Sequence, residues 1–437
     1  MAVTKDPVQP LSASGRVLPR RWLAQVAFIW TGQAVSMLTS FAAGFAAVWY
    51  ITETTGSALM LSVAAICAYL PIGLLSPFGG VIADKFNRKT TMIVADLAVG
   101  LVSLGLGLVV MLGQVSIGLL LFLITARAVG QAFHSPAMMA AMPMLVPDKH
   151  LLRINTLDQL VVSVSNIGGP AFGILLYTTL GLHWAMFLDF GGALVAVAGL
   201  ALAKIPTTHD AAMENQRVLA NLRDGFRAVA ATRGLLILIT GVILVEVVFA
   251  PLGALFPLMT YNHFDGDGFM ASIVEAAFGI GLLLGSLVLV VWGGGKRLAS
   301  LICVSTMVAG LATAVCGLLT AAMFAWFVVL CGVMALAFAG FNSPLITLIQ
   351  RFVPEAKTGR AMGLLITAIG LAAPLGIVAG GAVAEWIGVA PFFLVDGVAC
   401  LAVGVAVLVF RSVRALDQVP ASTPQQGNGC EAEATAA

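Results

Sequence analysis

Long apolar segments alternate with short polar segments along almost the whole chain of 437 residues. A segment of about 20 apolar residues is long enough to cross the hydrocarbon core of a bilayer. Backbone groups in lipid have no water to bond, so each such segment is expected to form a helix. The twelve predicted spans cover residues 22–50, 58–83, 91–112, 117–146, 155–181, 184–203, 234–260, 269–293, 298–320, 323–350, 361–384 and 391–410. The pattern predicts an all-α membrane protein with twelve transmembrane helices.

One polar insertion, residues 204–233, is much longer than the others and divides the spans into six and six. Its second part is predicted to form an amphipathic helix along the membrane surface. The predicted organisation is an N-terminal segment 1–21, a six-helix bundle 22–203, a linker 204–233, a second six-helix bundle 234–410 and a tail 411–437. The tail is rich in Pro, Gln, Ser and Thr, so it is predicted to be disordered.

Matched motifs indicate that the two halves are related. Asp189 follows Pro147 by 42 residues, and Asp396 follows Pro354 by the same 42. A Ser-Pro pair in the fourth span also has a counterpart in the tenth. The offset is about 207 residues, close to half the chain. A parallel repeat of six helices is the architecture of one large class of secondary transporters, whose substrate site lies between the halves.

Composition and charge restrict the class of protein. With 60% hydrophobic and only 10% charged residues, the chain is not a soluble domain. All 22 Lys and Arg residues except Arg127 fall at one end of the predicted spans. The loops at the other end carry only acids and histidines: Glu53, His183, His263, Asp265, Asp267 and Glu385. The positive-inside rule places the basic loops and both termini in the cytoplasm of a cell-membrane protein. The net charge of +2 gives no reason to expect nucleic acid as a partner.

Several other functions are disfavoured by what the chain lacks. The apolar run after residue 21 is too long for a cleavable signal peptide and lacks a small-residue cleavage site. The glycines at 293–295 do not have the spacing of a nucleotide-binding loop. The six cysteines are scattered, without metal-ligand spacing, and no nucleophile–base set is evident. The sequence therefore predicts no metal, no cofactor and no enzyme activity, and it leaves open a partner ATPase.

The loop at residues 80–89 is the most polar short connection. Its charged and small positions are Gly80, Asp84, Lys85, Arg88 and Lys89. Asn tolerates left-handed backbone angles, so Asn87 predicts a sharp turn there. The loop resembles the signature between helices 2 and 3 of the major facilitator superfamily, which usually has Gly in place of Asn87. The resemblance implies a gating role, in which Asp84 and Arg88 tie the inner ends of the two halves together. The alternative is a positive-inside loop that happens to contain an Asp.

Four further stretches resemble the macrolide-efflux branch of the drug:proton antiporters. They are residues 29–36 in the first span, 50–58 in the first outer loop, 127–136 in the fourth span and 255–258 in the seventh. The similarity covers most of the chain apart from the tail. It implies a secondary exporter of bulky amphipathic compounds, driven by protons.

Charged side chains inside spans cost roughly 2.5–3.5 kcal/mol on insertion scales and are usually functional. Arg127 stands where antiporters of this kind carry an Arg linked to proton coupling. Asp189, Glu246 and Glu275 are the acids predicted to carry the proton, because a carboxyl group that loses water holds a proton more readily. Asp396 is predicted to be structural. For each of the others, a purely structural hydrogen bond or ion pair is the alternative.

A Gly-Pro motif in the fifth span, with Gly169, Pro170 and Gly173, resembles the kinked hinge of exporters in this superfamily. Proline removes a helix hydrogen bond and glycine permits close helix approach. The motif favours export over uptake, although an ordinary membrane-helix kink is the alternative.

The substrate-binding candidates are few. They are Trp30 and Gln33 in the first span, which often lines the cavity in this superfamily, and Met138, whose side chain offers adaptable apolar surface. Lipid-facing or core packing is the alternative for Met138. His134 is predicted to be a packing histidine rather than a proton carrier.

Three functions fit the sequence. The leading hypothesis is a proton-driven exporter of macrolide-type antibiotics that works by alternating access, with the lipid bilayer, protons and a small amphipathic molecule as its partners. The alternatives are an exporter of a siderophore or another endogenous metabolite, and a non-transporting membrane sensor or partner subunit.

Overall fold

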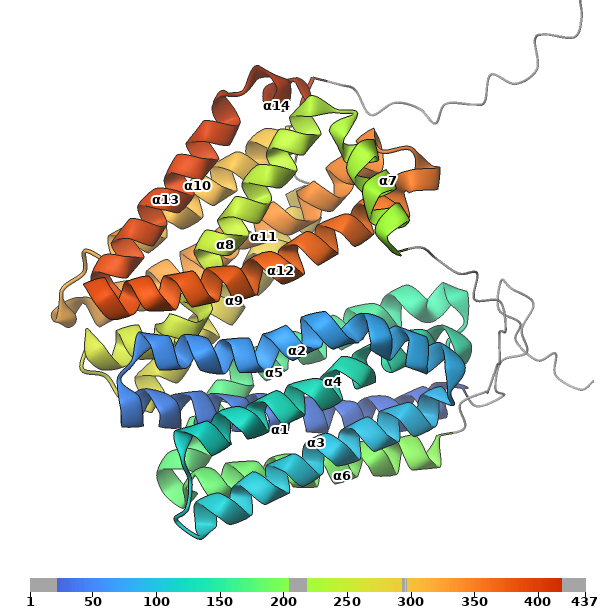
Figure 1. Cartoon of the computed structure of the whole chain (residues 1–437), viewed down its shortest axis with the longest axis vertical. Helices are drawn as coiled ribbons and strands as arrows, with labels where there is room; N and C mark the ends of the chain where they lie inside the picture. Colours follow the sequence, from blue (N-terminus) through green and yellow to red (C-terminus); the bar gives the residue numbers. More distant parts are fainter. Residues whose placement is uncertain (1–21, 204–217, 293–294, 296, 419–437) are drawn as a thin grey trace, which may run out of the picture.

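The computed structural model describes residues 22–203, 218–292, 295 and 297–418. The predicted N-terminal segment 1–21, linker positions 204–217 and tail positions 419–437 lie outside the described residues. The described part is almost entirely helical (Figure 1). Its helices are α1 (Trp22–Thr55), α2 (Ala58–Lys85), α3 (Arg88–Met111), α4 (Ile117–Leu145), α5 (Asp148–Leu180), α6 (Leu182–Leu202), α7 (Val218–Ala230), α8 (Arg233–Asn262), α9 (Gly268–Trp292), α10 (Leu298–Cys316), η1 (Ala321–Met323), α11 (Phe324–Phe352), α12 (Glu355–Ile387), α13 (Val389–Val409) and α14 (Arg411–Ala415).

Twelve of the described helices are long and apolar enough to cross a membrane, which confirms the predicted fold class. Some helices are longer than the predicted spans. α5 begins at Asp148 and α12 at Glu355, in each case directly after a proline at the N-cap. Proline suits the start of a helix, since the first amides have no partner within the helix. These helices therefore begin before their apolar segments do.

Two further boundaries differ from the prediction. Residues 50–55, predicted to lie in an outer loop, form the last turns of α1. The start of the predicted disordered tail is the short helix α14, where Val413 and Leu416 are buried. Asp417 follows it, and its carboxylate accepts hydrogen bonds from the amides of Ala299 and Ser300, at 2.8 and 3.0 Å. The tail was predicted to be disordered because it is polar, but these residues cap and pack against the first turn of α10.

The repeat predicted from two motifs extends through the helices. Adding 207 to the bounds of α4, α5 and α6 gives the bounds of α11, α12 and α13. The junction between α5 and α6 is Gly181 with φ 90°, and the junction between α12 and α13 is Gly388 with φ 91°. A positive φ of this kind favours glycine. Position i in the first half is therefore equivalent to position i + 207 in the second.

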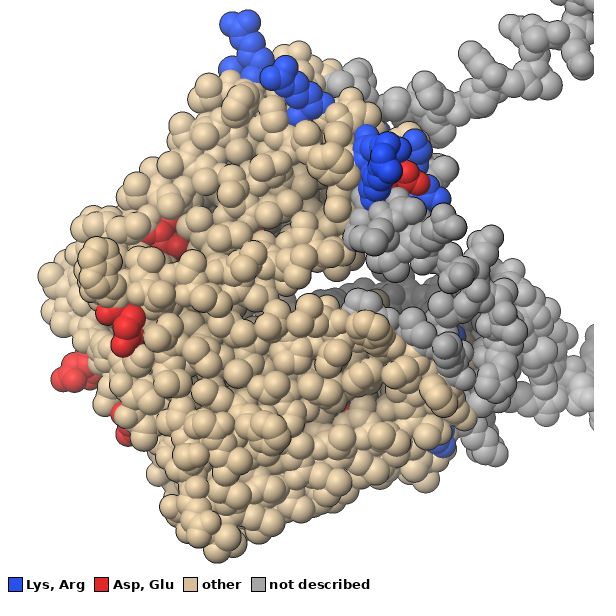
Figure 2. Space-filling model, viewed as in Figure 1, with Lys and Arg blue, Asp and Glu red and all other residues tan. Residues whose placement is uncertain are grey.

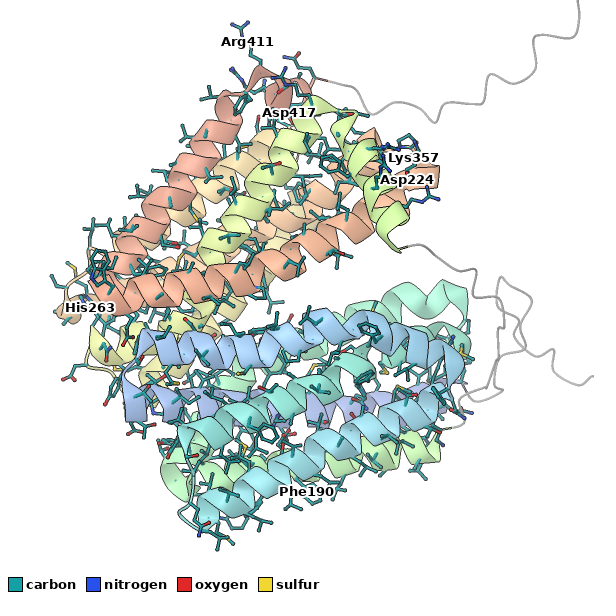
Figure 3. All side chains as sticks on the ribbon, viewed as in Figure 1. Phe190, Asp224, His263, Lys357, Arg411 and Asp417 are labelled. Carbon is teal, nitrogen blue, oxygen red and sulfur yellow. The ribbon has the colours of Figure 1, made fainter. Side chains whose placement is uncertain are left out.

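The helices pack as two groups, α1–α6 and α7–α14 (Figure 1). We call the end of the molecule that bears Arg88, Arg360 and Arg411 the basic end, and the end that bears Glu53 and Glu385 the acidic end. Figure 2 shows red acidic side chains at one end, and blue basic side chains mostly at the other. Figure 3 labels Arg411 and Asp417 at the basic end and His263 at the acidic end.

Small residues let the helices approach closely within each group. On α5, a Cβ atom at Gly173 would meet the backbone of Ala42 on α1. On α6, a Cβ atom at Gly192 would meet the side chain of Thr39 on the same helix α1. Close backbone approach gives membrane helices the van der Waals contact that drives their association. Helix α1 is thereby fixed between α5 and α6, and this fixes the rotation of its polar side chains.

The predicted amphipathic helix is α7, at the basic end. It buries Ala228 and Val229 and packs on the first turns of α12. The Arg360 guanidinium donates to the Asp224 carboxylate at 2.8 Å, and both side chains are more than 40% exposed. Figure 3 labels Asp224 on α7 and Lys357 on the neighbouring start of α12.

Candidate functional site

The two groups of helices are joined at the acidic end. Oε2 of Glu385, on α12, accepts hydrogen bonds from Ser57 Oγ at 2.9 Å and from the Leu59 amide at 3.1 Å. A side chain of one group thus caps the first turn of α2 in the other group. Next to it, Asn262 Nδ2 donates to the carbonyl of Gly56 at 3.1 Å.

Two helix pairs, α2 with α12 and α5 with α9, continue this contact into the molecule. Gly381 packs against Ser62, and Gly268 packs against Ile174. Toward the basic end the ribbons of α2 and α12 diverge (Figure 1), and Figure 2 shows the surface hollowed between the two groups. The structure is therefore closed at the acidic end and open toward the basic end.

A buried ion pair lies inside the N-terminal group. Arg127, on α4, donates to the carboxylate of Asp189 on α6, and their side chains are 17% and 1% exposed. Asp189 also accepts from Ser40 Oγ and Ser103 Oγ, each at 2.6 Å. Arg127 Nη1 lies 2.7 Å from Ser103 Oγ. Two predicted coupling residues are thus brought together, with serines from α1 and α3 completing the network.

The other two predicted coupling acids have different surroundings. Glu246 on α8 and Glu275 on α9 have no hydrogen-bond or ion-pair partner among the described residues. Glu275 is within electrostatic range of Tyr69 on α2, which belongs to the other group and is 63% exposed. Glu275 therefore faces the interface between the groups, whereas Asp189 lies inside one group.

Asp396, predicted to be structural, is buried on α13 at the position equivalent to Asp189. Its Oδ2 atom has no hydrogen-bond partner in the described structure. The position equivalent to Arg127 is Met334, so the second group has no matching base for this acid.

The structure describes the signature loop in part; the side chains of Asp84 and Lys85 and the surroundings of Gly80 lie outside the described residues. Lys89 Nζ donates to the carbonyls of Ala201 and Ala203 at 2.8 and 2.7 Å, which caps the C-terminus of α6. Arg88 Nη1 lies 2.6 Å from Met144 Sδ on α4. These contacts hold the loop to its own group in this open state.

The sharp turn predicted at Asn87 lies between the end of α2 and the start of α3, but Asn87 does not make it with a left-handed conformation. Its φ is −62° and its ψ is 115°. The side chain instead accepts hydrogen bonds from the amides of Lys89 and Thr90, at 3.0 and 3.4 Å. Asn is among the best N-cap residues because its short side chain reaches these free amides. The turn is thus made by a helix cap, which Asn supplies and Gly does not.

The Gly-Pro motif lies on the side of α5 that faces α1. A Cβ atom at Gly169 would meet Phe41, and one at Gly173 would meet Ala42. Pro170 lies between them inside the helix and is buried. The tight packing expected for this motif is present, and its role as a hinge stays a prediction.

The predicted substrate-binding residues lie near the basic end. Trp30 and Met138 pack against an apolar cluster that includes Ile29 and Met92. Gln33 Nε2 donates to the carboxylate of Asp96 at 2.9 Å.

Asp96 is a buried acid that the sequence reasoning missed. It lies five residues after the start of the predicted third span, among apolar residues. The signal that could have revealed it is its spacing of seven residues from both Lys89 and Ser103, which places all three on one face of α3.

A groove with a volume of about 640 Å³ lies between α5 and α9. Phe172, Leu175 and Phe269 make its lining mostly apolar, and Asp267 lies at its rim near the acidic end. It contains none of Arg127, Asp189, Glu246 and Glu275, so it is separate from the candidate coupling residues.

Comparison with known families decides the class of this transporter-like fold. Residues 22–432 match the family described as transmembrane secretion effector, within the major facilitator superfamily. The chain belongs to this family. It is an efflux transporter and a multi-pass protein of the cell membrane, and neither the family nor the relatives below are enzymes.

Curated relatives align with the transporter over most of their length. Macrolide efflux protein A of Streptococcus pyogenes is 31% identical over 397 residues, which are 91% of this chain and 98% of the relative. Multidrug efflux pump Tap of Mycobacterium tuberculosis is 27% identical over 387 residues, which are 85% of this chain and 90% of the relative.

Solved structures share the transporter's fold at low sequence identity. A bacterial homologue of the lysosomal transporter Spinster, in an inward-facing and unoccupied conformation, gives a TM-score of 0.66 at 15% identity, covering 91% of this chain and 97% of that one. A POT family transporter in complex with a thioalcohol-conjugated peptide gives a TM-score of 0.68 at 12% identity, covering 88% and 95%.

Proposed function

We propose that the transporter exports bulky amphipathic compounds of the macrolide type, by alternating access driven by the proton gradient. The observation that carries the mechanism is the asymmetry between the two ends: Glu385 clamps the acidic end, and the groups separate toward the basic end. By the positive-inside rule the basic end and both termini are cytoplasmic. The described state is then the one that takes up substrate from the cytoplasm.

Two groups of six spans, residues 22–203 and 234–410, move relative to each other in this proposal. The linker between them includes α7, which stays docked on α12. Asp84, Lys85, Arg88 and Lys89, next to Gly80, hold the inner ends of the two groups together when the basic end closes. Gly169, Pro170 and Gly173 keep α5 packed on α1 while the groups rock. Trp30, Gln33 and Met138, near the basic end, contact the substrate as it enters in this proposal.

Proton coupling involves two sets of acids. Glu275 and Glu246 have no fixed partner, so a proton or a cationic group of the substrate competes for each carboxylate. Asp189 has a partner, so protonating it weakens its ion pair with Arg127 and loosens the side-chain link between α4 and α6. A proton that changes the fit between helices supplies the differential free energy that any coupled transition requires.

The substrate class rests on the relatives. The alignment with a macrolide efflux protein spans 98% of that protein, and a multidrug pump aligns over 90% of its length. Both names favour drug export over export of a siderophore, and the transporter family favours export over sensing.

Accumulation of radiolabelled erythromycin, a 14-membered macrolide, tests the proposal in cells that overproduce the transporter. Accumulation should fall relative to cells with the empty vector, and a protonophore should erase the difference. Cells that produce Glu275→Gln at the same level should accumulate as much erythromycin as cells with the empty vector. Reduced accumulation of another drug alone would replace the substrate class, whereas increased accumulation of erythromycin would contradict export.

A further inference from the structure

A second polar cluster lies in the N-terminal group on the basic side of the Arg127–Asp189 network. It consists of Gln33 on α1, Asp96 on α3 and His134 on α4. His134 Nε2 lies 3.3 Å from Asp96 Oδ1, and the two residues are each 8% exposed. Gln33 donates to the other carboxylate oxygen of Asp96 at 2.9 Å. The acid is thus held by one neutral donor and faces one titratable base.

The two clusters repeat along three helices. Gln33 precedes Ser40 by seven residues, Asp96 precedes Ser103 by seven, and His134 follows Arg127 by seven. Seven residues are about two helical turns, or roughly 10 Å. α4 runs opposite to α1 and α3, so all three shifts point toward the basic end. The group therefore contains two polar layers, each with an acid and a base.

The equivalent positions of the second group show that packing does not require this cluster. Adding 207 to 96 and 134 gives Cys303 and Phe341, both buried. The same helices pack there without a charge. Burying ionisable groups costs free energy that apolar side chains do not cost. The cluster costs free energy to bury and the second group of helices lacks it, so its presence points to a function.

The groups that face Asp96 limit what the cluster can bind. Gln33 faces it from α1 and His134 from α4, and the Arg127–Asp189 pair lies one layer farther in. On α3 itself, Lys89 points toward the basic end, where backbone carbonyls of α6 hold its ammonium group. His134 is the described titratable group at contact distance from Asp96. His134 Nε2 has no hydrogen-bond partner, so no neighbouring group requires this nitrogen to carry a proton or to lack one.

We propose that Asp96 and His134 form a second proton-binding site in this transporter, which binds one proton between them and releases it toward the open basic end. This inference rests on the proposed proton-driven function. With the proton bound, the charges of the Asp96 carboxylate and the protonated His134 cancel. The pair then has no net charge to bury away from water. When His134 Nε2 gives the proton to water, Asp96 is left as a carboxylate beside a neutral imidazole. Gln33 stabilises that carboxylate through its hydrogen bond.

Four variants purified into proteoliposomes test the site. They are Asp96→Asn, His134→Gln, the swapped pair Asp96→His/His134→Asp, and the control Asp396→Asn, a buried acid outside both clusters. We expect the two single variants to keep erythromycin exchange at equilibrium, because exchange needs no net proton movement. Their accumulation driven by an imposed pH gradient should fall about tenfold, within the usual range of coupling between sites. The swapped pair should recover part of it, and the control should match the wild type.

Proton release provides a readout that does not depend on transport. In weakly buffered detergent solution, a pH-indicator dye follows the protons that leave the transporter when erythromycin binds. The two single variants should release fewer protons per bound erythromycin than the wild type or Asp396→Asn.

The outcomes separate the two proposals. Wild-type protein that exchanges erythromycin without responding to a pH gradient would overturn the proton-driven function. The second site alone would be overturned if the wild type responds to the pH gradient and the two single variants accumulate erythromycin and release protons to the same extent as the wild type. Single variants that lose exchange and accumulation in parallel, with no recovery in the swapped pair, would assign Asp96 and His134 a structural role and also overturn it.

Discussion

Asp189 and Asp396 occupy equivalent positions but have opposite surroundings. Asp189 is bonded to Arg127 and two serines, whereas Oδ2 of Asp396 has no partner in the described structure. The residue equivalent to Arg127 is Met334, whose sulfur accepts a hydrogen bond from Thr313 Oγ1 at 2.8 Å. Only the first of these two equivalent acids has an ion-pair partner. Asp189 is therefore the acid whose charge determines how neighbouring helices pack.

Asp189→Asn should destabilise the purified transporter by about 3–5 kcal/mol, because it leaves the largely buried guanidinium of Arg127 without a carboxylate. The double variant Arg127→Met/Asp189→Asn removes both charges and copies the base-free second group, so it should recover much of the loss. Thermal unfolding in one detergent at constant pH measures the destabilisation of the single variant and the recovery in the double variant, with Asp396→Asn as the control. Equal destabilisation in the single and double variants would show that the ion pair is not what stabilises these helices.

The sequence identifies Arg127 and Asp189 as candidates but does not reveal that they pair. They lie 62 residues apart on α4 and α6, and pairing depends on how both helices rotate about their axes. Nearly all positions in these spans are apolar, so periodicity does not determine that rotation. The same reason explains why His134 was interpreted as a packing residue and Asp96 was missed. Polar residues spaced by seven on three neighbouring helices carry the signal, but it is recognisable only once the helices are known to be neighbours.

At the scale of helices, the fold is predicted well because a bilayer permits few alternatives. The twelve apolar segments become the twelve spanning helices. The ends of the helices are predicted less well, since beyond the lipid a helix continues until a cap or a turn stops it. α5 and α12 start directly after prolines, seven and six residues before their apolar segments, and hydrophobicity does not encode these distances.

Close approach of α1 and α5 depends on glycine. We expect Gly173→Ala to destabilise the transporter by about 1–3 kcal/mol, because its Cβ would overlap the backbone carbonyl of Ala42, which cannot move away without shifting α1. Gly44→Ala, on α1 itself, is the matched control, since nothing lies within 4 Å of a Cβ there. Unfolding temperature and the amount of folded protein in membranes report the effect. Similar losses for both variants would show that close approach at Gly173 is not what stabilises the packing of α1 on α5.

At the scale of the whole molecule, the contacts between the groups are concentrated at one end. Much of this interface is small or apolar, as where Gly381 packs on Ser62. The Glu385 carboxylate adds the charged part, because it caps α2 from the other group. Interfaces of this kind open and close as rigid bodies when few polar contacts must be exchanged. Glu385 is therefore a latch that must release before the acidic end can open.

Glu385→Ala should shift the transporter toward the state open at the acidic end. The variant removes the acceptor for Ser57 Oγ and the Leu59 amide, and since Glu385 is exposed the loss is about 1 kcal/mol, or roughly fivefold in the ratio of open to closed. Ser62→Cys supplies a reporter, because Ser62 is buried under Gly381 in the closed state and its hydroxyl has no hydrogen-bond partner to lose.

A membrane-impermeant maleimide added outside the cell should label the Ser62→Cys protein about fivefold faster when Glu385→Ala is also present. The control is Glu53→Ala, which removes an acid from the same end, but one bonded to Tyr177 within its own group, so its labelling rate should equal that of Ser62→Cys alone. The same chain without the introduced cysteine gives the background from the native thiols. If Glu385→Ala left the labelling rate unchanged, the apolar contacts alone would keep the acidic end closed. If Glu53→Ala raised the rate equally, the effect would be a general loosening of that end rather than release of a latch between the two groups.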